Sequence, residues 1–230
     1  MTILPVRRAG RVILTIPDRL DRSSDSMHFE VLLEEESAQA AMKNILPKIL
    51  RSEDSFQIHP YNGKKNLLNK LPGRLRGYRK WITSDYRIVI LIDRDRDDCT
   101  LLKQELERIV AEAGLSTKAA PHHDGSFQVL NRIAIEELEA WFLGDMEALA
   151  SAYSGVPPTL GTKERYRDPD AIVDAWETLE RVLQRAGYPG RLQKIRVAST
   201  ISRYMVPERN RSASFQAFCQ GLQACIRQQS

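Results

Sequence analysis

The chain has 230 residues, a formal net charge of +4 and 42% hydrophobic residues, an ordinary composition for a globular protein. This composition excludes a collagen-like or mostly disordered chain, and no apolar run reaches the roughly 18 residues that indicate a transmembrane helix. The three cysteines form neither a disulfide framework nor a zinc-binding pattern. Because the N-terminus also lacks the apolar core of a signal peptide, we expect a cytoplasmic protein that does not associate with membranes.

Residues 1–26 are rich in arginine and end in a polar stretch, so we interpret them as an N-terminal arm or extension that includes a short strand over 11–16. A clearer pattern begins at Met27. Short runs of apolar and β-branched residues predict strands over 28–33, 56–60, 86–92 and 127–135. The third run, YRIVILI, is apolar throughout, which is typical of a central strand in a parallel sheet.

Helical spacing of apolar residues predicts the elements between and after these strands. We expect a helix that Ser37 caps and Pro47 interrupts, and a second helix that Asp97 or Asp98 caps. Residues 64–80 are predicted to be a basic connector, broken by Pro72-Gly73 and Gly77. Further helices are expected over 137–153, 170–186, 192–205 and 214–227.

The alternation of strands and helices predicts an α/β domain with a largely parallel sheet over residues 27–153. After residue 153 the strand pattern ends and only helical patterns remain. We therefore expect residues 154–230 to form a helical C-terminal extension that packs on the α/β domain.

Acidic residues follow three of the predicted strands. Glu34 and Glu35 follow the first, Asp93 and Asp95 follow strand 86–92, and the run Glu136–Glu139 follows strand 127–135. The carboxyl ends of parallel strands share one edge of the sheet, where open α/β sheets bind ligands. Close carboxylates repel each other, and a divalent cation relieves this repulsion. Oxygen ligands without His or Cys favour Mg²⁺ or Mn²⁺.

Basic residues are concentrated elsewhere. Residues 59–80 contain seven Lys or Arg and no acid, and residues 191–211 contain six basic residues and one acid. Such stretches are typical of phosphate binding, although each residue on its own is also explained as a solvated surface charge. Asn210 and Ser212 are equally explained as a turn and a helix cap. The candidates for nucleic-acid binding are Lys64, Lys65, Arg74, Arg76, Lys194, Arg209 and Arg211.

Four segments in order resemble the Toprim domain of topoisomerases, primases and OLD-type nucleases. They are LEEES at 33–37, IDRDRDDC at 92–99, IEELEAWFLGD at 135–145 and PERNRSASF at 207–215. The chain is most similar to stand-alone bacterial Toprim-like proteins of uncharacterised function, several of which accompany ATPases in phage-defence loci. Together these segments span about residues 28–218, and the resemblance implies a Toprim-like α/β domain over residues 27–153 with the helical extension packed on it.

The resemblance also assigns roles to the acidic residues. It implies that Glu34 is the first-strand glutamate, which acts as a general acid or base or binds the metal. It also implies that Asp93 and Asp95 are a metal-binding pair. Glu137 and Glu139 are candidates for a second cation position, although residues two apart on a regular helix diverge by about 200°. The chain departs from the family where Glu35 stands in place of the usual Gly. The candidate catalytic residues are Glu34, Glu35, Asp93, Asp95 and Lys64.

These observations predict a Mg²⁺- or Mn²⁺-dependent phosphodiesterase, an endonuclease of Toprim type that acts on DNA or RNA in phage defence with a partner ATPase. The alternative is a non-catalytic Toprim-like module that binds nucleic acid or the ATPase. A third hypothesis is an enzyme acting on small phosphates, but the basic stretches favour a polymer. Residues 170–186, or those beyond 211, are candidate docking surfaces for a partner or for a second copy in a homo-oligomer.

Overall fold

The computed structural model describes residues 26–228, which contain a four-stranded sheet with the strand order β2-β1-β3-β4. All three strand pairings are parallel, which confirms the expected α/β class. The strand expected over 11–16 lies outside the described residues. The strands are β1 (His28–Leu33), β2 (Ser55–Pro60), β3 (Tyr86–Asp93) and β4 (Val129–Ala134).

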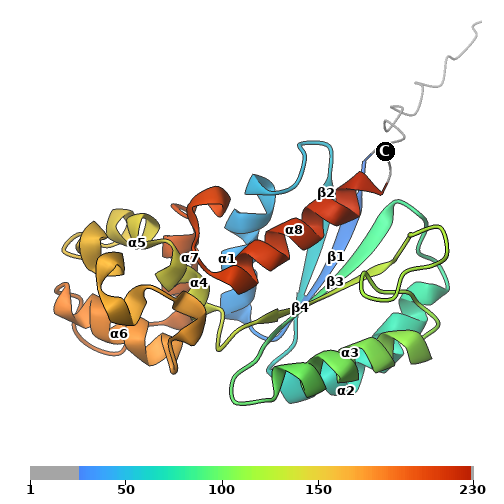
Figure 1. Cartoon of the computed structure of the whole chain (residues 1–230), viewed down its shortest axis with the longest axis horizontal. Coiled ribbons are helices and arrows are strands. Elements are labelled where there is room, and N and C mark those ends of the chain that lie inside the picture. Colours follow the sequence, from blue (N-terminus) through green and yellow to red (C-terminus); the bar gives the residue numbers. More distant parts are fainter. Residues whose placement is uncertain (1–25, 229–230) are drawn as a thin grey trace, which may run out of the picture.

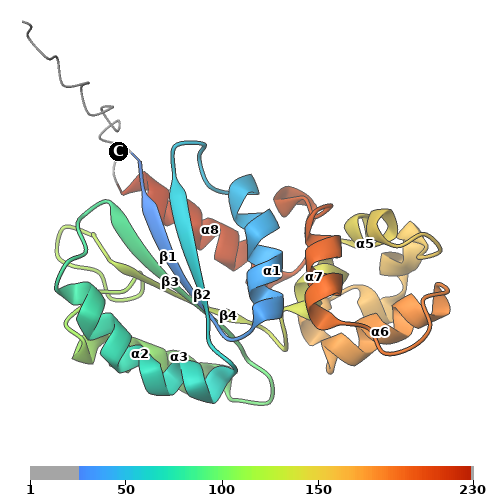
Figure 2. The same cartoon turned by 180° about the vertical axis from the view of Figure 1, so that it is seen from behind.

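Two pairs of helices cover the two faces of the sheet (Figures 1 and 2). Helices α1 (Glu36–Ile45) and α8 (Ala213–Arg227) cover one face, and α2 (Lys64–Arg79) and α3 (Cys99–Glu112) cover the other. The alternation along β1 explains this: Phe29 and Val31 join the core under α1 and α8, whereas Leu32 joins the core under α2 and α3. The C-terminal helix α8 therefore shares a core with β1.

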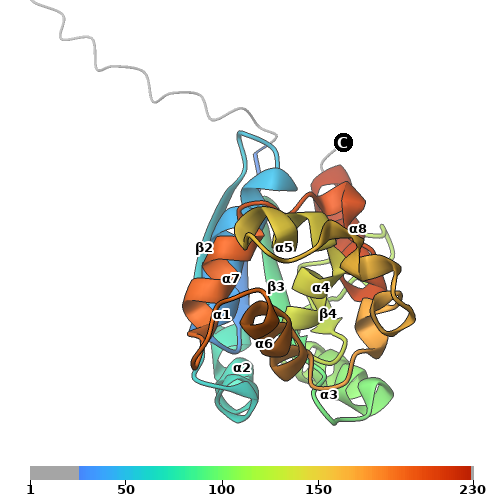
Figure 3. The ribbon, with the colours of Figure 1, turned by 90° about the vertical axis from the view of Figure 1, so that its left-hand side faces the viewer.

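Four further helices lie beyond one end of the sheet, in front of it in Figure 3. They are α4 (Glu139–Gly144), α5 (Met146–Ala152), α6 (Ala175–Arg185) and α7 (Lys194–Ser202). Since α4 follows β4 directly, this is the carboxyl end of the strands. Residues 26–228 contain no helix that is long and apolar enough to cross a membrane.

The prediction of a broken connector over residues 64–80 was wrong, because α2 is one continuous helix with Pro72 inside it. Leu67, Leu71, Leu75 and Tyr78 form its buried stripe at helical spacing. Burying each large apolar side chain contributes roughly 1.5–3 kcal/mol. That total exceeds the cost of about 3 kcal/mol for a helical proline and about 1 kcal/mol for each glycine. Tertiary packing therefore overrides local propensity here.

Several helix boundaries also differ from the prediction, among them those of α7, which spans Lys194–Ser202 and not 192–205. The helix expected over 137–153 is two helices, because the carboxylate of Asp145 caps α5 by accepting a hydrogen bond from Ala148 N at 3.1 Å. The helix expected from residue 170 begins at Ala175. Ser37 lies inside α1, and its hydroxyl donates to Glu35, the N-cap residue. Asp98 caps α3 as expected, and Pro47 lies in the 3-10 turn that ends α1.

Candidate active site

Three strands bring acidic residues to the same edge of the sheet. Glu34 follows β1, Asp93 ends β3, and the segment after β4 leads into α4, which begins at Glu139. A side-chain oxygen of Glu34 accepts a hydrogen bond from the backbone N–H of Asp93 at 2.7 Å. The first acid is therefore tied to the carboxyl end of the central strand, as parallel geometry predicts.

Buried Glu34 and Glu139 and half-buried Asp93 form the inner part of this site. The residues Glu34 and Glu139 are 7% and 2% exposed, and burial raises the pKa of each to about 7. Burial also raises the pKa of Asp93 well above its usual range, with further contributions from the negative charges of Glu139 and Glu34. Since Asp93 is within electrostatic reach of both Glu34 and Glu139, we call these three residues the carboxylate cluster.

Glu35 and Asp95 lie at the margin of the carboxylate cluster. The charges of both raise the pKa of Asp93 further, so both are within electrostatic reach of it. Glu35 accepts a hydrogen bond from Ser37 at 3.2 Å, and Asp95 pairs with a lysine from α2. All four acids that the sequence proposed from the first and third strands are therefore gathered at this edge.

Lys64, the first residue of α2, is the first cation of the site. Its Nζ lies 2.8 Å from an Asp95 oxygen and 2.7 Å from an Asp97 oxygen, and it donates to the carbonyl of Arg94 at 3.0 Å. Burial disfavours the charge of Lys64, but these carboxylates raise its pKa above the ordinary value. The preceding Gly63 has a φ of 92°, which favours glycine, and α2 has no side-chain N-cap.

Lys194 at the start of α7 is the second cation. Its Nζ lies 3.9 Å from a Glu139 oxygen and 5.4 Å from the centre of the Trp176 ring. Burial lowers the pKa of Lys194, but the charges of Glu139, Glu35 and Glu137 raise it overall. The C-terminal segment thus contributes a charge directly to the edge of the sheet.

The structure adds Arg94, which sequence reasoning did not select, and pairs it with Glu136, one of the acids expected at this edge, across the loops after β3 and β4. Asp95 and Glu136 have φ values of 50° and 62°, and Asp95 N donates to the Glu136 carbonyl at 2.7 Å. Such left-handed residues cost about 1–2 kcal/mol each and concentrate at functional sites. The position of Arg94 between two candidate acids was the only signal in the sequence.

Glu137 and Glu139 have different environments, although the sequence paired them. An oxygen of Glu137 accepts a hydrogen bond from the backbone N–H of Trp176 at 2.7 Å, at the first turn of α6. Glu139 is buried beside Asp93 and Lys194. Glu137 therefore anchors a helix, whereas Glu139 belongs to the carboxylate cluster.

The chemistry of the carboxylate cluster fits a hard divalent cation, because every donor is an oxygen and the acids repel one another. Within residues 26–228, however, no group of three or more His, Cys, Asp or Glu is already close enough to hold a metal ion. Lys64 and Lys194 instead supply the neutralising charge.

The remaining basic candidates do not reach the carboxylate cluster. Lys65, Arg74 and Arg76 are exposed along α2. The guanidinium of Arg74 lies 4.7 Å from the centre of the Tyr78 ring. These three residues form a basic surface that leads away from the edge of the sheet.

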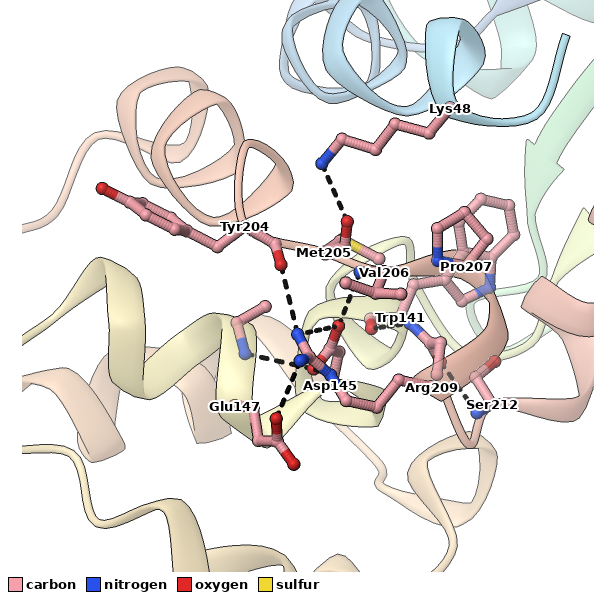
Figure 4. Close-up of polar contacts among 12 residues, drawn as sticks. Lys48, Trp141, Asp145, Glu147, Tyr204, Met205, Val206, Pro207, Arg209 and Ser212 are labelled. Atoms are coloured by element: carbon pink, nitrogen blue, oxygen red, sulfur yellow. Dashed lines mark hydrogen bonds and ion pairs between the residues drawn. The ribbon is translucent and has the colours of Figure 1, made fainter.

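Arg209 and Arg211, which the sequence predicted to bind phosphate, both bond to oxygens of the protein. Figure 4 shows the contacts of Arg209. Arg209 forms a two-point ion pair with Asp145, with distances of 2.7 and 3.0 Å. Arg211 donates to the carbonyls of Gly161 and Tyr166. The alternative explanation of this segment is confirmed, since Ser212 caps α8.

Comparison with known proteins identifies a family but no activity. A family model described as "Domain of unknown function (DUF4276)" matches residues 33–223. Searches of curated proteins and of solved structures found no match. The matched segment contains every residue of the site, from Glu34 to Lys194, and provides no link to the Toprim domain or to a nuclease.

Proposed function

The chain belongs to the DUF4276 family, and from the site at the carboxyl edge we propose that it is a divalent-cation-dependent phosphodiesterase that cleaves nucleic acid. One observation carries this proposal: buried Glu34 and Glu139 and half-buried Asp93 meet at one edge of the sheet, where Glu34 contacts the backbone of Asp93 and the charges of Glu34 and Glu139 raise the pKa of Asp93. Burying uncompensated acids destabilises a fold, so such clusters are concentrated at functional sites. The resemblance of the same residues to the Toprim pattern supports this chemistry.

In this proposal Asp93 and Glu139 would hold Mg²⁺ or Mn²⁺, with Asp95 at the margin and Glu34 beside these ligands as the proton acceptor. The bound cation supplies charge neutralisation and a water of lowered pKa. Glu34 is suited to accept a proton from the attacking water, because its pKa of about 7 lies near neutral pH. Glu34 also touches the backbone of Asp93, so the base and the ligand are held in fixed relation.

The substrate phosphate is held by the cations of the site. Lys64 pairs with Asp95 and Lys194 lies beside Glu139, so the two lysines bring to the carboxylate cluster the positive charge that a phosphodiester needs. The N-terminus of α2, which has no side-chain cap, adds backbone N–H groups at the same place. The basic surface of α2 favours a polymer over a small phosphate, because it extends beyond the edge of the sheet.

A cleavage assay with isosteric variants tests the proposal. Purified protein is incubated with labelled plasmid, single-stranded DNA or tRNA, in Mg²⁺, Mn²⁺ or EDTA. We expect metal-dependent cleavage that Asp93→Asn reduces by at least about a hundredfold, because the amide cannot replace an anionic ligand. Glu105→Gln, an equal charge change at an exposed position of α3, is the matched control and retains activity.

A second candidate function is a binding module without catalysis. The observation that favours it is that Lys64 already pairs with Asp95 and Asp97, which leaves fewer free charges for a cation. This candidate predicts intact nucleic-acid binding and no cleavage in any metal. A partner ATPase, which the Toprim resemblance implies, is then added to the same assay, and cleavage that needs both proteins and Asp93 restores the first candidate.

A further inference from the structure

A groove of about 740 Å³ runs along the outer side of α2, away from the carboxylate cluster. This volume lies within the roughly 300–1,000 Å³ that is usual for ligand sites. The groove begins at Tyr61, whose backbone N–H donates to the carbonyl of Leu33, the residue before Glu34. It ends at Trp81, beyond the last turn of α2, and α2 itself is about 24 Å long at 1.5 Å per residue.

Two glycines keep the groove hollow. Gly73 and Gly77 are four residues apart on α2, both line the groove, and a Cβ at either position would meet nothing within 4 Å. A glycine inside a helix costs about 1 kcal/mol relative to alanine. Since no neighbouring atom of the chain requires glycine here, packing within the chain does not explain these two residues. An occupant of the groove would explain them.

The charge of the groove is positive. Lys70, Arg74 and Arg76 line it, and no acidic residue occurs anywhere in residues 59–80. Arg74 is held over the ring of Tyr78, whose hydroxyl donates to the buried carboxyl of Glu30 at 2.9 Å. This arrangement fixes one guanidinium at the wall of the groove and suits a polyanion.

The far end of the groove presents an aromatic surface. Trp81 is 51% exposed, and it is the only tryptophan among the exposed large hydrophobic side chains of residues 26–228. Its ring is supported by Tyr78 at 5.5 Å and by Tyr86 at 5.3 Å, centre to centre. A supported ring with a free surface stacks on unpaired bases, which duplexes do not offer.

We propose that this groove binds single-stranded nucleic acid, with phosphates held by Lys70, Arg74 and Arg76 and a base stacked on Trp81. The inference rests on the proposed function and names its substrate class, because the groove leads to the same edge of the sheet as Glu34. DNA and RNA share the required chemistry, so the test includes both.

Fluorescence anisotropy of the full chain tests the groove in EDTA, where binding is measured without cleavage. The probes are labelled oligo(dT) and oligo(U) of about 12 nucleotides and a duplex of equal length. Gly77→Leu fills the groove and improves helix propensity, so it unfolds no more easily than wild type but binds at least about tenfold more weakly. Trp81→Ala has a similar effect on affinity, and Trp81→Phe restores most of it.

Tyr204→Ala is the matched control, because Tyr204 is 47% exposed and lies outside the groove. Wild-type affinity in Gly77→Leu and Trp81→Ala overturns the proposal, and so does binding of the duplex at least as tight as that of both single strands. The cleavage assay separates the two hypotheses. Asp93-dependent cleavage with unaffected groove variants refutes the groove alone, whereas groove-dependent binding without cleavage refutes the phosphodiesterase alone.

Discussion

Helix α4 joins two buried acidic regions that differ in how their charge is compensated. Asp145, directly after α4, is 1% exposed and accepts hydrogen bonds from Ala148 N, Val206 N and two nitrogens of Arg209 at 2.7–3.1 Å (Figure 4). Glu139, the first residue of α4, is 2% exposed, and its nearest cation, Lys194, is 3.9 Å away. The two acids are therefore equally buried, but Asp145 accepts four hydrogen bonds whereas Glu139 has only a distant lysine to compensate its charge.

The difference teaches that burial by itself does not identify a functional acid. A carboxylate with a full set of donors contributes to stability, and removing it leaves the donors unpaired. A carboxylate that is buried among other acids destabilises the fold unless a proton or a cation is bound. The three predictions below separate these two cases.

The largest expected effect on stability is at Asp145, the acid with a full set of hydrogen-bond donors. Asp145→Ala removes the buried acceptor of Val206 N and of two Arg209 nitrogens, and also the cap of α5, so we expect a loss of about 3–5 kcal/mol in the free energy of unfolding. Urea unfolding measures it. Glu147→Gln, at the exposed carboxylate that also contacts Arg209, should change stability by less than about 0.5 kcal/mol. Similar values for the two variants would contradict the comparison.

At the carboxylate cluster we expect a smaller effect of opposite sign, because replacing Glu139 should stabilise the protein at high pH. Glu139 has a pKa of about 7 when folded and 4.5 as its ordinary value, so the unfolded chain loses this proton first as the pH rises. Stability from this group is present below pH 4.5 and is lost as the pH rises through 7.

Glu139→Gln mimics the protonated acid, so its stability should depend less on pH between 5 and 8. At pH 8 we expect the variant to be more stable than wild type by on the order of 2 kcal/mol. Denaturant unfolding at several pH values measures this. A variant that is less stable at pH 8 would show that Lys194 fully compensates Glu139.

The smallest expected effect is stabilisation by a cation. Mg²⁺ at tenfold its dissociation constant should raise the free energy of unfolding of the wild type by about 1.4 kcal/mol. Thermal unfolding with Mg²⁺ and then EDTA tests this. Asp93→Asn and Glu139→Gln should lose the effect, whereas Glu147→Gln should keep it. Equal stabilisation of all variants would place the cation outside the carboxylate cluster.

Some of the site followed from the sequence alone. Parallel strands place their carboxyl ends at one edge, so the positions of Glu34 and Asp93 directly after two such strands were enough to bring them together. The position of Lys64 relative to the acids was not predictable, because its segment was interpreted as a broken connector. The stripe from Leu67 to Tyr78 makes it a helix whose first residue meets Asp95.

Residues distant along the chain were the least predictable. Arg209 and Lys194 both belong to the basic stretch of residues 191–211, yet Arg209 bonds to Asp145 and Lys194 lies beside Glu139. Nothing local distinguishes them, because their partners Asp145 and Glu139 lie tens of residues earlier, directly after α4 and at its first position. Composition alone gives Arg209 and Lys194 the same predicted role. Their spatial neighbours show that Arg209 is structural and that Lys194 belongs to the site.

The sequence by itself determined the α/β class, the strands and the edge at which the acids meet, because alternation and strand periodicity are local properties of the chain. The tertiary structure decided which acids have a full set of hydrogen-bond donors and which cations lie beside them. It also formed the glycine-lined groove that leads from this edge along α2. The physical reason is that hydrogen-bond supply and desolvation depend on contacts between distant segments. Those contacts exist only after the helices have packed.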